Sequence, residues 1–332
     1  MDYALIWYML IAIAVFAYVA LDGFDLGIGI LFLGGESVQE RDLMMNSIAP
    51  VWDGNETWLV LGGGGLFAVF PLAYSVVMPA LYAPLIMMLL GLIFRGVAFE
   101  YRFRTHRGQF LWDSSFFIGS LIATFTQGMM LGTLLQGITV VDRQYSGGWF
   151  DWFTPFTVFC GLVTVAAYTL LGACWLLIKL PKSYHRRYYV TAKRCALIMV
   201  AMVAILSLWL PISNHDIAAR WFSFPQALLF LLIPAGSGYL VYLLFKDLIE
   251  HKPVKAYLAS LGLFFLASLG FGVSTYPYIV PHSLTYADAA APDTSLKFLL
   301  TGTVFLLPLI IAYTAYSYWV FRGRLKEGEG YH

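Results

Sequence analysis

The sequence predicts an all-α polytopic membrane protein with about nine transmembrane helices, arranged as two four-helix bundles plus one peripheral helix. Of its 332 residues, 60% are hydrophobic and only 12% are charged, and the mean hydropathy is +0.75. An ordinary soluble domain carries about 25% charged residues. The chain also contains nine apolar stretches of roughly 20 residues, the length that a helix needs to cross a hydrocarbon core of about 30 Å. We expect a single integral membrane domain over residues 1–332.

The predicted spans follow one another with short loops between them. They cover approximately residues 4–33, 54–72, 76–98, 115–138, 156–178, 195–213, 225–246, 256–275 and 297–320. The first lacks a preceding basic segment and a small-residue cleavage site, so we expect a retained span rather than a signal peptide. The second contains the run Gly62, Gly63, Gly64 and Gly65, and the seventh contains Pro234. Membrane helices tolerate both residue types, because neighbouring groups satisfy the freed backbone.

The basic residues predict the orientation of these spans. With nine spans, all but three of the 20 Lys and Arg residues fall on one side of the membrane, and the exceptions are Arg143, Arg220 and Lys297. Cytoplasmic loops carry the excess of Lys and Arg. We therefore expect the N-terminus outside and the C-terminus in the cytoplasm.

Several function classes are disfavoured by composition. The formal net charge is only +1, so there is no basic surplus for binding nucleic acid. Cys160, Cys174 and Cys195 have neither CxxC nor metal-ligand spacing, so neither a disulfide framework nor a metal site is expected. No Gly-rich phosphate-binding motif is present, so nucleotide chemistry is not expected.

Two carboxylates of the first span point to a functional site. Asp22 and Asp25 lie three residues apart, a spacing that puts both on one helix face. Counted from Trp7 with a rise of 1.5 Å per residue, they lie roughly 22 Å and roughly 27 Å along the helix. Both therefore belong to the cytoplasmic third of the membrane, where ionisable groups are costly and usually functional.

The same membrane face receives further ionisable residues from the next two spans. The second span begins with Asp53 and Glu56, and the third ends with Arg95 and Glu100. Consecutive helices with short connections are usually neighbours, so these groups are expected to form a hydrogen-bonded acid and arginine cluster. Such a cluster is either a structural ion-pair network or a device that moves protons or compensates a buried charge. The number of carboxylates near hydrocarbon favours the second interpretation.

The histidines argue against a haem in this chain. His106, His185, His215, His251, His282 and His332 all fall in loops or at span ends. A membrane cytochrome normally presents an axial His or Met from a helix. Five helical methionines, Met78, Met87, Met88, Met129 and Met130, are conceivable ligands, but membrane methionines are far more often packing residues.

Glycines predict close helix packing. Gly23 and Gly27 form a GxxxG step, and small residues let helix backbones approach closely inside a membrane. The run from Gly62 to Gly65 predicts the same for the second span. A smooth glycine surface also suits contact with a partner subunit.

Six sequence blocks resemble subunit II of the cytochrome bd family of quinol oxidases. They are LDGFDLGIGIL (21–31), NSIAPVWDGNETWLVLGGGGLFAVFP (46–71), FRGVAFEYR (94–102), LLQGI (134–138), YPYIVP (276–281) and AYTAYSYWVFRGR (312–324). Together they extend over nearly the whole chain. The short outer loop between the sixth and seventh spans resembles the cyanide-insensitive branch of the family.

The resemblance implies a subunit of an electrogenic, non-pumping oxidase that oxidises quinol and reduces dioxygen to water with cytoplasmic protons. In this family, subunit I carries the b-type haems, haem d or a third b-type haem, and the quinol-oxidising loop. Subunit II would support that heterodimer partner and carry no haem itself. A small single-span accessory subunit, lipids and a structurally bound quinone are further expected partners.

By motif position, the resemblance also assigns roles to individual residues. Asp25 and Asp53 match carboxylates of the proton route, to which we add Asp22, Glu56 and Glu100 as candidates from their location. Arg95 matches an arginine that keeps the haem centres intact. Trp58 matches a tryptophan beside a proposed dioxygen access path.

Two other functions are considered. A proton-coupled secondary transporter would place its acids near the bilayer midplane at a repeat interface. Here the acids cluster towards one end, and no acid pattern repeats in the second half. A small membrane cytochrome acting alone is disfavoured by the lack of helical histidines.

Overall fold

The computed structural model describes residues 1–105, 107–213, 215–224 and 226–326 of the chain. His106, His332 and the side chains of His215 and Arg220, all discussed above, lie outside the described set. The long helices are α1 (Tyr3–Leu31), α3 (Trp52–Val69), α5 (Tyr82–Arg102), α6 (Gln109–Gln136), α7 (Pro155–Lys179), α8 (His185–Ser213), α10 (Gln226–Ile249), α11 (Pro253–Thr275) and α13 (Asp293–Val320). The shorter elements are α2 (Val38–Asn46), α4 (Pro71–Ala80), α9 (His215–Phe222), α12 (Tyr286–Ala289), the 3₁₀ turns η1 (Phe32–Gly34) and η2 (Lys182–Tyr184), and the strands β1 (Val140–Val141), β2 (Gln144–Tyr145), β3 (Tyr278–Val280) and β4 (Leu284–Thr285).

The predicted all-α membrane architecture is confirmed. Within the described chain, eight helices are long and apolar enough to cross a membrane. The one predicted span outside these eight is the second, which corresponds to α3; this helix has 18 residues and so extends about 27 Å. Averaged over its length, α3 is less apolar than a membrane-crossing helix usually is, because its first turns carry Asp53, Asn55 and Glu56.

Three predicted span ends differ from the ends of the helices. The second and third spans, predicted at 54–72 and 76–98, are separated by the short helix α4, which begins at Pro71. Phe70, with φ −125° and ψ 62°, breaks the helix before Pro71, whose missing N–H and fixed φ suit a first helical position. The sixth span, predicted from residue 195, begins ten residues earlier at His185. Its first turns are basic, and long Lys and Arg side chains extend a helix readily beyond the apolar region.

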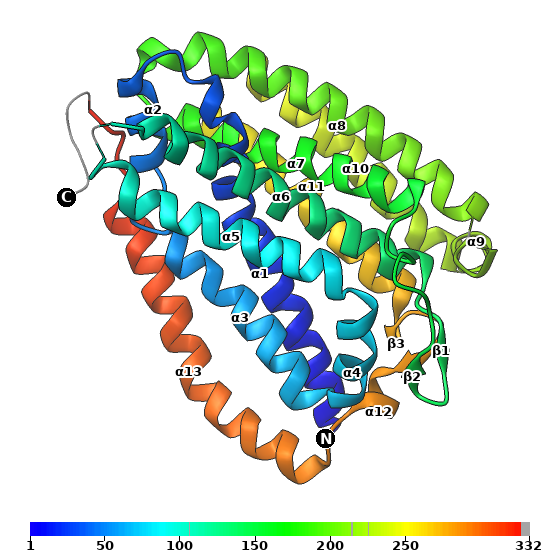
Figure 1. Cartoon of the computed structure of the whole chain (residues 1–332). Coiled ribbons are helices and arrows are strands. Elements are labelled where there is room, and N and C mark those ends of the chain that lie inside the picture. The colour runs from blue at the N-terminus through cyan, green and yellow to red at the C-terminus, as the bar shows by residue number, and fades with distance from the viewer. Residues whose placement is uncertain (106, 214, 225, 327–332) are drawn as a thin grey trace.

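The long helices form two groups of four with one helix outside (Figure 1). In the first group, α5 packs on α6, α6 on α1 and α1 on α3. In the second, α7 packs on α8 and α11, and α10 on α11 and α8. Helix α13 runs along the outside beside α1 and α3. This arrangement matches the predicted pair of bundles with one peripheral helix.

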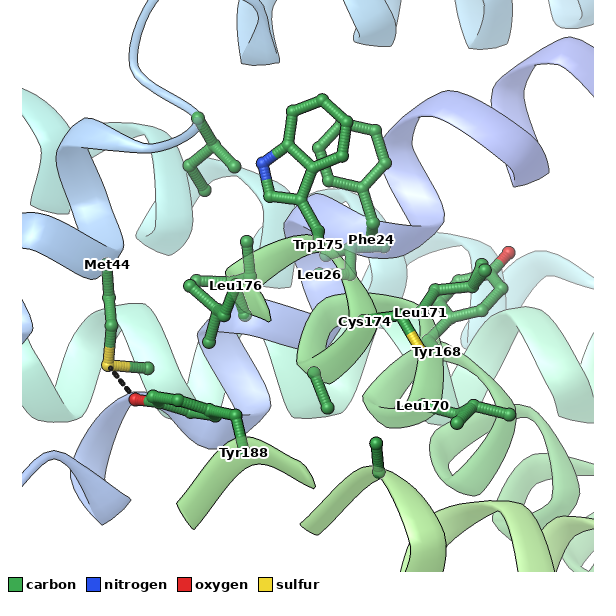
Figure 2. Packing of buried hydrophobic residues seen from close by; sticks show 14 of the residues in the cluster. Phe24, Leu26, Met44, Tyr168, Leu170, Leu171, Cys174, Trp175, Leu176 and Tyr188 are labelled. Carbon is green, nitrogen blue, oxygen red and sulfur yellow. Dashed lines mark hydrogen bonds between the residues drawn. The ribbon is translucent and has the colours of Figure 1, made fainter. Parts of the chain in front are cut away.

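The two groups meet where α7 packs against α1 and α6. Figure 2 shows the apolar centre of this contact, in which Phe24 of α1 stacks on Trp175 of α7 with ring centroids 4.2 Å apart. Leu26, Tyr168 and Leu176 are also buried there. Residues on both sides of Asp25 are therefore fixed by packing against α7.

At the end of the molecule that holds the N-terminus, α4, α12 and the two small antiparallel hairpins form a separate apolar cluster. Two long-range hydrogen bonds attach the start of α13 to it. The Trp7 indole N–H donates to the carbonyl oxygen of Leu296 (3.0 Å), and the Ala291 N–H donates to the carbonyl oxygen of Val69 (2.8 Å). These bonds position the start of α13.

Trp7→Phe is expected to loosen the start of α13. The change removes one buried hydrogen bond, which contributes about 1 kcal/mol to the free energy of unfolding. Thermal denaturation of the purified protein in detergent measures the loss. Trp149→Phe is the matched control, because Trp149 is 78% exposed and its replacement should leave the midpoint unchanged. Equal midpoints for the two variants would contradict this role of Trp7.

Candidate functional site: a buried acid and arginine cluster

Asp22 and Asp25 of α1 are both completely buried. Their spacing along a regular helix puts them on one face, as predicted. Carboxylates are almost never fully buried unless their charge is compensated by partners. The neighbours of these two groups therefore decide what the site can do.

Arg95 of α5 joins three helices through its guanidinium group. Its Nη1 donates to Asp22 Oδ1 at 2.6 Å, and its Nη2 donates to Glu56 Oε1 of α3. The Arg95 side chain is completely buried, whereas that of Glu56 is 26% exposed. Removing one partner from such a buried ion pair leaves an uncompensated charge in a medium that solvates it poorly.

Asp25 has a different environment from Asp22. Asn55 Nδ2 donates to Asp25 Oδ2 (2.7 Å) and to the carbonyl oxygen of Leu21 (3.1 Å). Tyr318 of α13 in turn donates its hydroxyl to Asn55 Oδ1 (3.0 Å). Among the described residues, Asp25 Oδ1 has no hydrogen-bond partner and neither oxygen of Asp25 contacts a cationic group. We refer to Asp22, Asp25, Asn55, Glu56 and Arg95 as the acid–arginine cluster.

A polar chain that was not predicted continues from the cluster towards the middle of α1. Gln127 Nε2 of α6 donates to the hydroxyl oxygen of Tyr18 (2.8 Å), and Tyr168 of α7 donates to Gln127 Oε1 (3.0 Å). Tyr18 lies one turn before Asp22. The isolated amide of Gln127 within an apolar span was the sequence signal for this chain.

The structure does not bring all predicted candidates together. Asp53 is exposed at the start of α3. Glu100 is also exposed and pairs with Arg104 of the same helix, at 3.3 Å between Arg104 Nη2 and Glu100 Oε2. The buried cluster thus contains Asp22, Asp25, Glu56 and Arg95, whereas Asp53 and Glu100 lie outside it.

Trp58 lies on α3, about one helical turn after Asn55. It is 6% exposed and packs with Ala14 and Tyr18 of α1. In the described part of the chain, its indole N–H has no hydrogen-bond acceptor.

The glycines of α1 and α3 differ in how they pack. A Cβ atom added at Gly27 would lie 1.8 Å from the carbonyl oxygen of Tyr168, so α1 and α7 are in backbone contact there, as predicted. At Gly62 and Gly65 the nearest atoms would be 3.5 Å away, and Gly63 and Gly64 have nothing within 4 Å. Within this chain the glycine run therefore makes only ordinary contact with α1, through Gly62 and Gly65, and Gly63 and Gly64 face away from it.

A second buried ion-pair network lies at the same end of the molecule as the acid–arginine cluster. Sequence reasoning missed it. Arg102 Nη1 is 2.6 Å from Asp42 Oδ1, and its Nε is 2.5 Å from Asp113 Oδ1. Arg41 Nε lies 3.0 Å from the other oxygen of Asp113. The network attaches α2 to the end of α5 and the start of α6. Asp113 at the start of an apolar span was the available signal.

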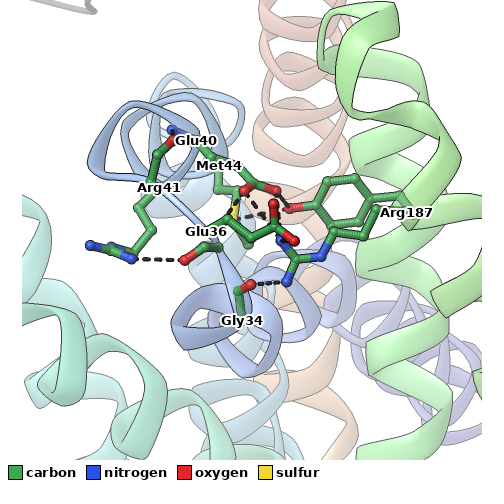
Figure 3. A network of polar contacts seen from close by, with 9 residues as sticks. Gly34, Glu36, Glu40, Arg41, Met44 and Arg187 are labelled. Atoms are coloured by element: carbon green, nitrogen blue, oxygen red, sulfur yellow. Dashed lines mark hydrogen bonds and ion pairs between the residues drawn. The ribbon is translucent and has the colours of Figure 1, made fainter.

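A third network attaches α2 to α8 (Figure 3). The buried Glu40 accepts hydrogen bonds from the hydroxyl of Tyr188 (2.8 Å) and from Arg187 Nη1 (3.3 Å). Arg187 also donates to the carbonyl oxygen of Gly34. Both carboxyl oxygens of Glu40 are thus engaged, which favours a structural role for this network. Across the described residues, no three His, Cys, Asp or Glu side chains lie close enough together to hold a metal ion.

Known proteins are similar to this chain in both sequence and fold. Residues 3–321 match the family described as cytochrome bd terminal oxidase subunit II. The chain is 31% identical to cytochrome bd-I ubiquinol oxidase subunit 2 of Escherichia coli (strain K12), with 98% of this chain and 95% of that protein covered. It is 28% identical to cytochrome bd ubiquinol oxidase subunit 2 of Bacillus subtilis (strain 168), with 98% and 97% covered. The solved structure of bd oxidase from Geobacillus thermodenitrificans superposes with a TM-score of 0.79 at 16% identity, over 97% of this chain and 99% of that one.

Proposed function

This chain belongs to the cytochrome bd terminal oxidase subunit II family, and from this premise we propose that its acid–arginine cluster supplies protons to the oxidase complex. Membership makes the chain a subunit of a quinol oxidase, an oxidoreductase of the bacterial inner membrane that includes a partner subunit I. The resemblance seen in the sequence motifs is thereby confirmed. The relatives named above are subunits of oxidases and not transporters.

The chemistry of the complex requires a proton supply. Reduction of dioxygen to water consumes one proton for every electron that arrives from quinol. We place the b-type haems, and haem d or a third b-type haem, in subunit I. Protons taken from the cytoplasm then have to cross part of the membrane before they meet the electrons.

The observation that carries the proposal is the environment of Asp25. Its carboxyl group is completely buried, is held by the neutral amide of Asn55 and has one oxygen without a partner among the described residues. A group that relays protons must be stable in the same place with and without the proton. A carboxyl group fixed by a cation, as Asp22 is by Arg95, is poorly suited to that exchange, because the cation favours the ionised form.

The location of the cluster supports uptake from the cytoplasm. The last turns of α1, α5 and α13 and the first turns of α3 lie at one end of the molecule, opposite the N-terminus (Figure 1). The distribution of Lys and Arg assigns that end to the cytoplasm. Asp53, exposed at the same end, would meet cytoplasmic protons first. Glu56, which is partly exposed, would connect the surface to the buried groups.

We assign Arg95 a supporting role. Its guanidinium compensates Asp22 and Glu56 and joins α1, α3 and α5. The haem-bearing subunit would then rest on a surface whose helices hold their relative positions. The outward glycines Gly63 and Gly64 of α3 would offer that subunit a smooth contact, and Trp58 would lie beside the path of dioxygen.

Asp25→Asn tests the proposal. Asparagine keeps the size and the hydrogen bond but cannot carry a proton, so we expect oxygen consumption with quinol to fall by about tenfold or more. The reduced-minus-oxidised haem spectrum should stay unchanged, because no haem contact is removed.

Asp142→Asn is the matched control for Asp25→Asn. Asp142 is exposed at the opposite end of the molecule, and its positive φ of 49° is a conformation that asparagine also adopts. We expect this variant to respire at the normal rate. A fully active Asp25→Asn enzyme would exclude Asp25 from the proton route.

A further inference from the structure

A cavity of about 280 Å³ lies at the same end of the molecule as the acid–arginine cluster. It is lined by the segment before α3, the last turns of α7, the last turn of α13 and the residues that follow α13. Its walls include Ser47, Val51, Trp175, Lys179 and Tyr318. A water molecule occupies about 30 Å³ in the liquid, so the cavity has room for several.

Lys179 holds the α13 side of the cavity in place. Its ammonium group donates to the carbonyl oxygens of Phe321 and Gly323, just after the end of α13. The N–H of Leu325 donates back to the carbonyl oxygen of Lys179 at 2.9 Å. A cation at the C-terminus of a helix is favourable, because the free carbonyl groups there carry partial negative charge. The last turn of α13, and with it Tyr318, is thereby fixed against α7.

Three contacts place the cavity one layer of side chains away from Asp25. Tyr318 lines the cavity and donates to Asn55 Oδ1, and Asn55 donates to Asp25 Oδ2. Trp175 lines the cavity and stacks on Phe24, the residue next to Asp25 (Figure 2).

The third contact runs through the backbone of α3. Val51 lines the cavity, and its carbonyl oxygen accepts the N–H of Asn55 at 3.0 Å. The cavity wall and the partner of Asp25 are therefore one helical turn apart, about 5.4 Å.

We infer that this cavity is the aqueous entrance of the proton route to Asp25, and that Tyr318 is the positioning residue that separates the two and holds Asn55. The inference rests on the proposed role of Asp25. Only a proton moves: water in the cavity brings it from the cytoplasm, the Asp25 carboxylate accepts it, and the carboxylic acid returns to the carboxylate when it releases the proton to the next acceptor. Lys179 takes no part in the transfer and keeps the wall in place.

Filling the cavity tests the inference. Ser47→Cys puts a thiol of nearly the same size in the wall, in a chain whose partly exposed Cys195 is replaced by Ser; Cys160 and Cys174 are buried. A small membrane-impermeant thiosulfonate is added to inverted membrane vesicles, which expose the cytoplasmic side. Relative to the same vesicles before treatment, we expect oxygen consumption to fall about tenfold or more, the same loss that we expect for Asp25→Asn. The haem spectrum should not change.

Ser75→Cys is the matched control for the thiol experiment. Ser75 lines a separate cavity on α4 at the opposite end of the molecule, so this variant is treated in right-side-out vesicles, which expose that end, and its modification should leave respiration unchanged. Tyr318→Phe adds a second measurement without a reagent. It removes only the hydroxyl group that holds Asn55, and we expect about a threefold slower rate, the effect of one lost hydrogen bond.

The outcomes separate this inference from the proposed function. If Asp25→Asn slows respiration but the modified Ser47→Cys enzyme keeps its rate, the cavity is not the entrance. Failure of the thiol to react at all would show that the cavity is closed to cytoplasmic water and would equally overturn the inference. If Asp25→Asn respires normally, the proposed function itself is wrong.

Discussion

Arg95→Gln is expected to lower the free energy of unfolding by about 3–5 kcal/mol, because it leaves the buried carboxylate of Asp22 and the partly exposed carboxylate of Glu56 without their cation. The guanidinium is fully buried and contacts groups on two other helices, so no solvent takes its place. Chemical denaturation of the purified complex in mild detergent measures the change. If Arg95 also supports the haem-bearing subunit, the amount of haem per complex falls in parallel.

Arg104→Gln provides the control for Arg95→Gln on the same helix. The Arg104 side chain is 77% exposed and pairs with an exposed Glu100, and surface ion pairs contribute about 0–1 kcal/mol. The double variant Arg95→Gln with Asp22→Asn should recover part of the lost stability, since it removes one of the uncompensated charges. An Arg95→Gln complex as stable as the Arg104→Gln complex would contradict the assigned role of Arg95.

The depth of the candidate site could be predicted from sequence, whereas the direction in which each side chain points could not. Counting residues along the spans placed Asp25, Arg95 and Glu100 at one membrane face. Arg95 and Glu100, however, are five residues apart, which turns them about 140° from each other around the helix. Once Arg95 points inward, Glu100 must point outward. Which of the two faces inward depends on the neighbouring helices, and single-span hydropathy does not contain that information.

The same limit applies to helix packing and to the boundaries of the helices. The GxxxG step of α1 predicted close approach at Gly27, but the partner surface at Tyr168 and Gly172 is more than 140 residues away in the chain and has no matching GxxxG pattern. The break at Phe70 was missed because an apolar window does not register a proline at the first position of a new helix. Gln127 and Asp113 were passed over because hydropathy averaged over a span hides one strongly polar residue among apolar and small polar neighbours.

Gly27→Ala is expected to force α1 and α7 apart. The new Cβ atom would lie 1.8 Å from the carbonyl oxygen of Tyr168 and 3.0 Å from the backbone nitrogen of Gly172. Both are backbone atoms, which cannot rotate away as a side chain does, so the helices themselves have to move. Overpacking of this kind costs about 1–3 kcal/mol when side chains can adjust, and we expect about 3 kcal/mol or more here.

The displacement caused by Gly27→Ala should also reach the proton site, because Asp25 lies two residues before Gly27 and its 2.7 Å bond to Asn55 depends on the position of α1. We therefore expect both a lower denaturation midpoint and slower oxygen consumption. Gly302→Ala in α13 is the control, since nothing lies within 4 Å of its added Cβ atom and alanine favours a helix by about 0.5–1 kcal/mol over glycine. A Gly27→Ala protein as stable as Gly302→Ala would show that α1 and α7 do not pack backbone to backbone. The position assigned to Asp25, between α3 and α7, would then be wrong as well.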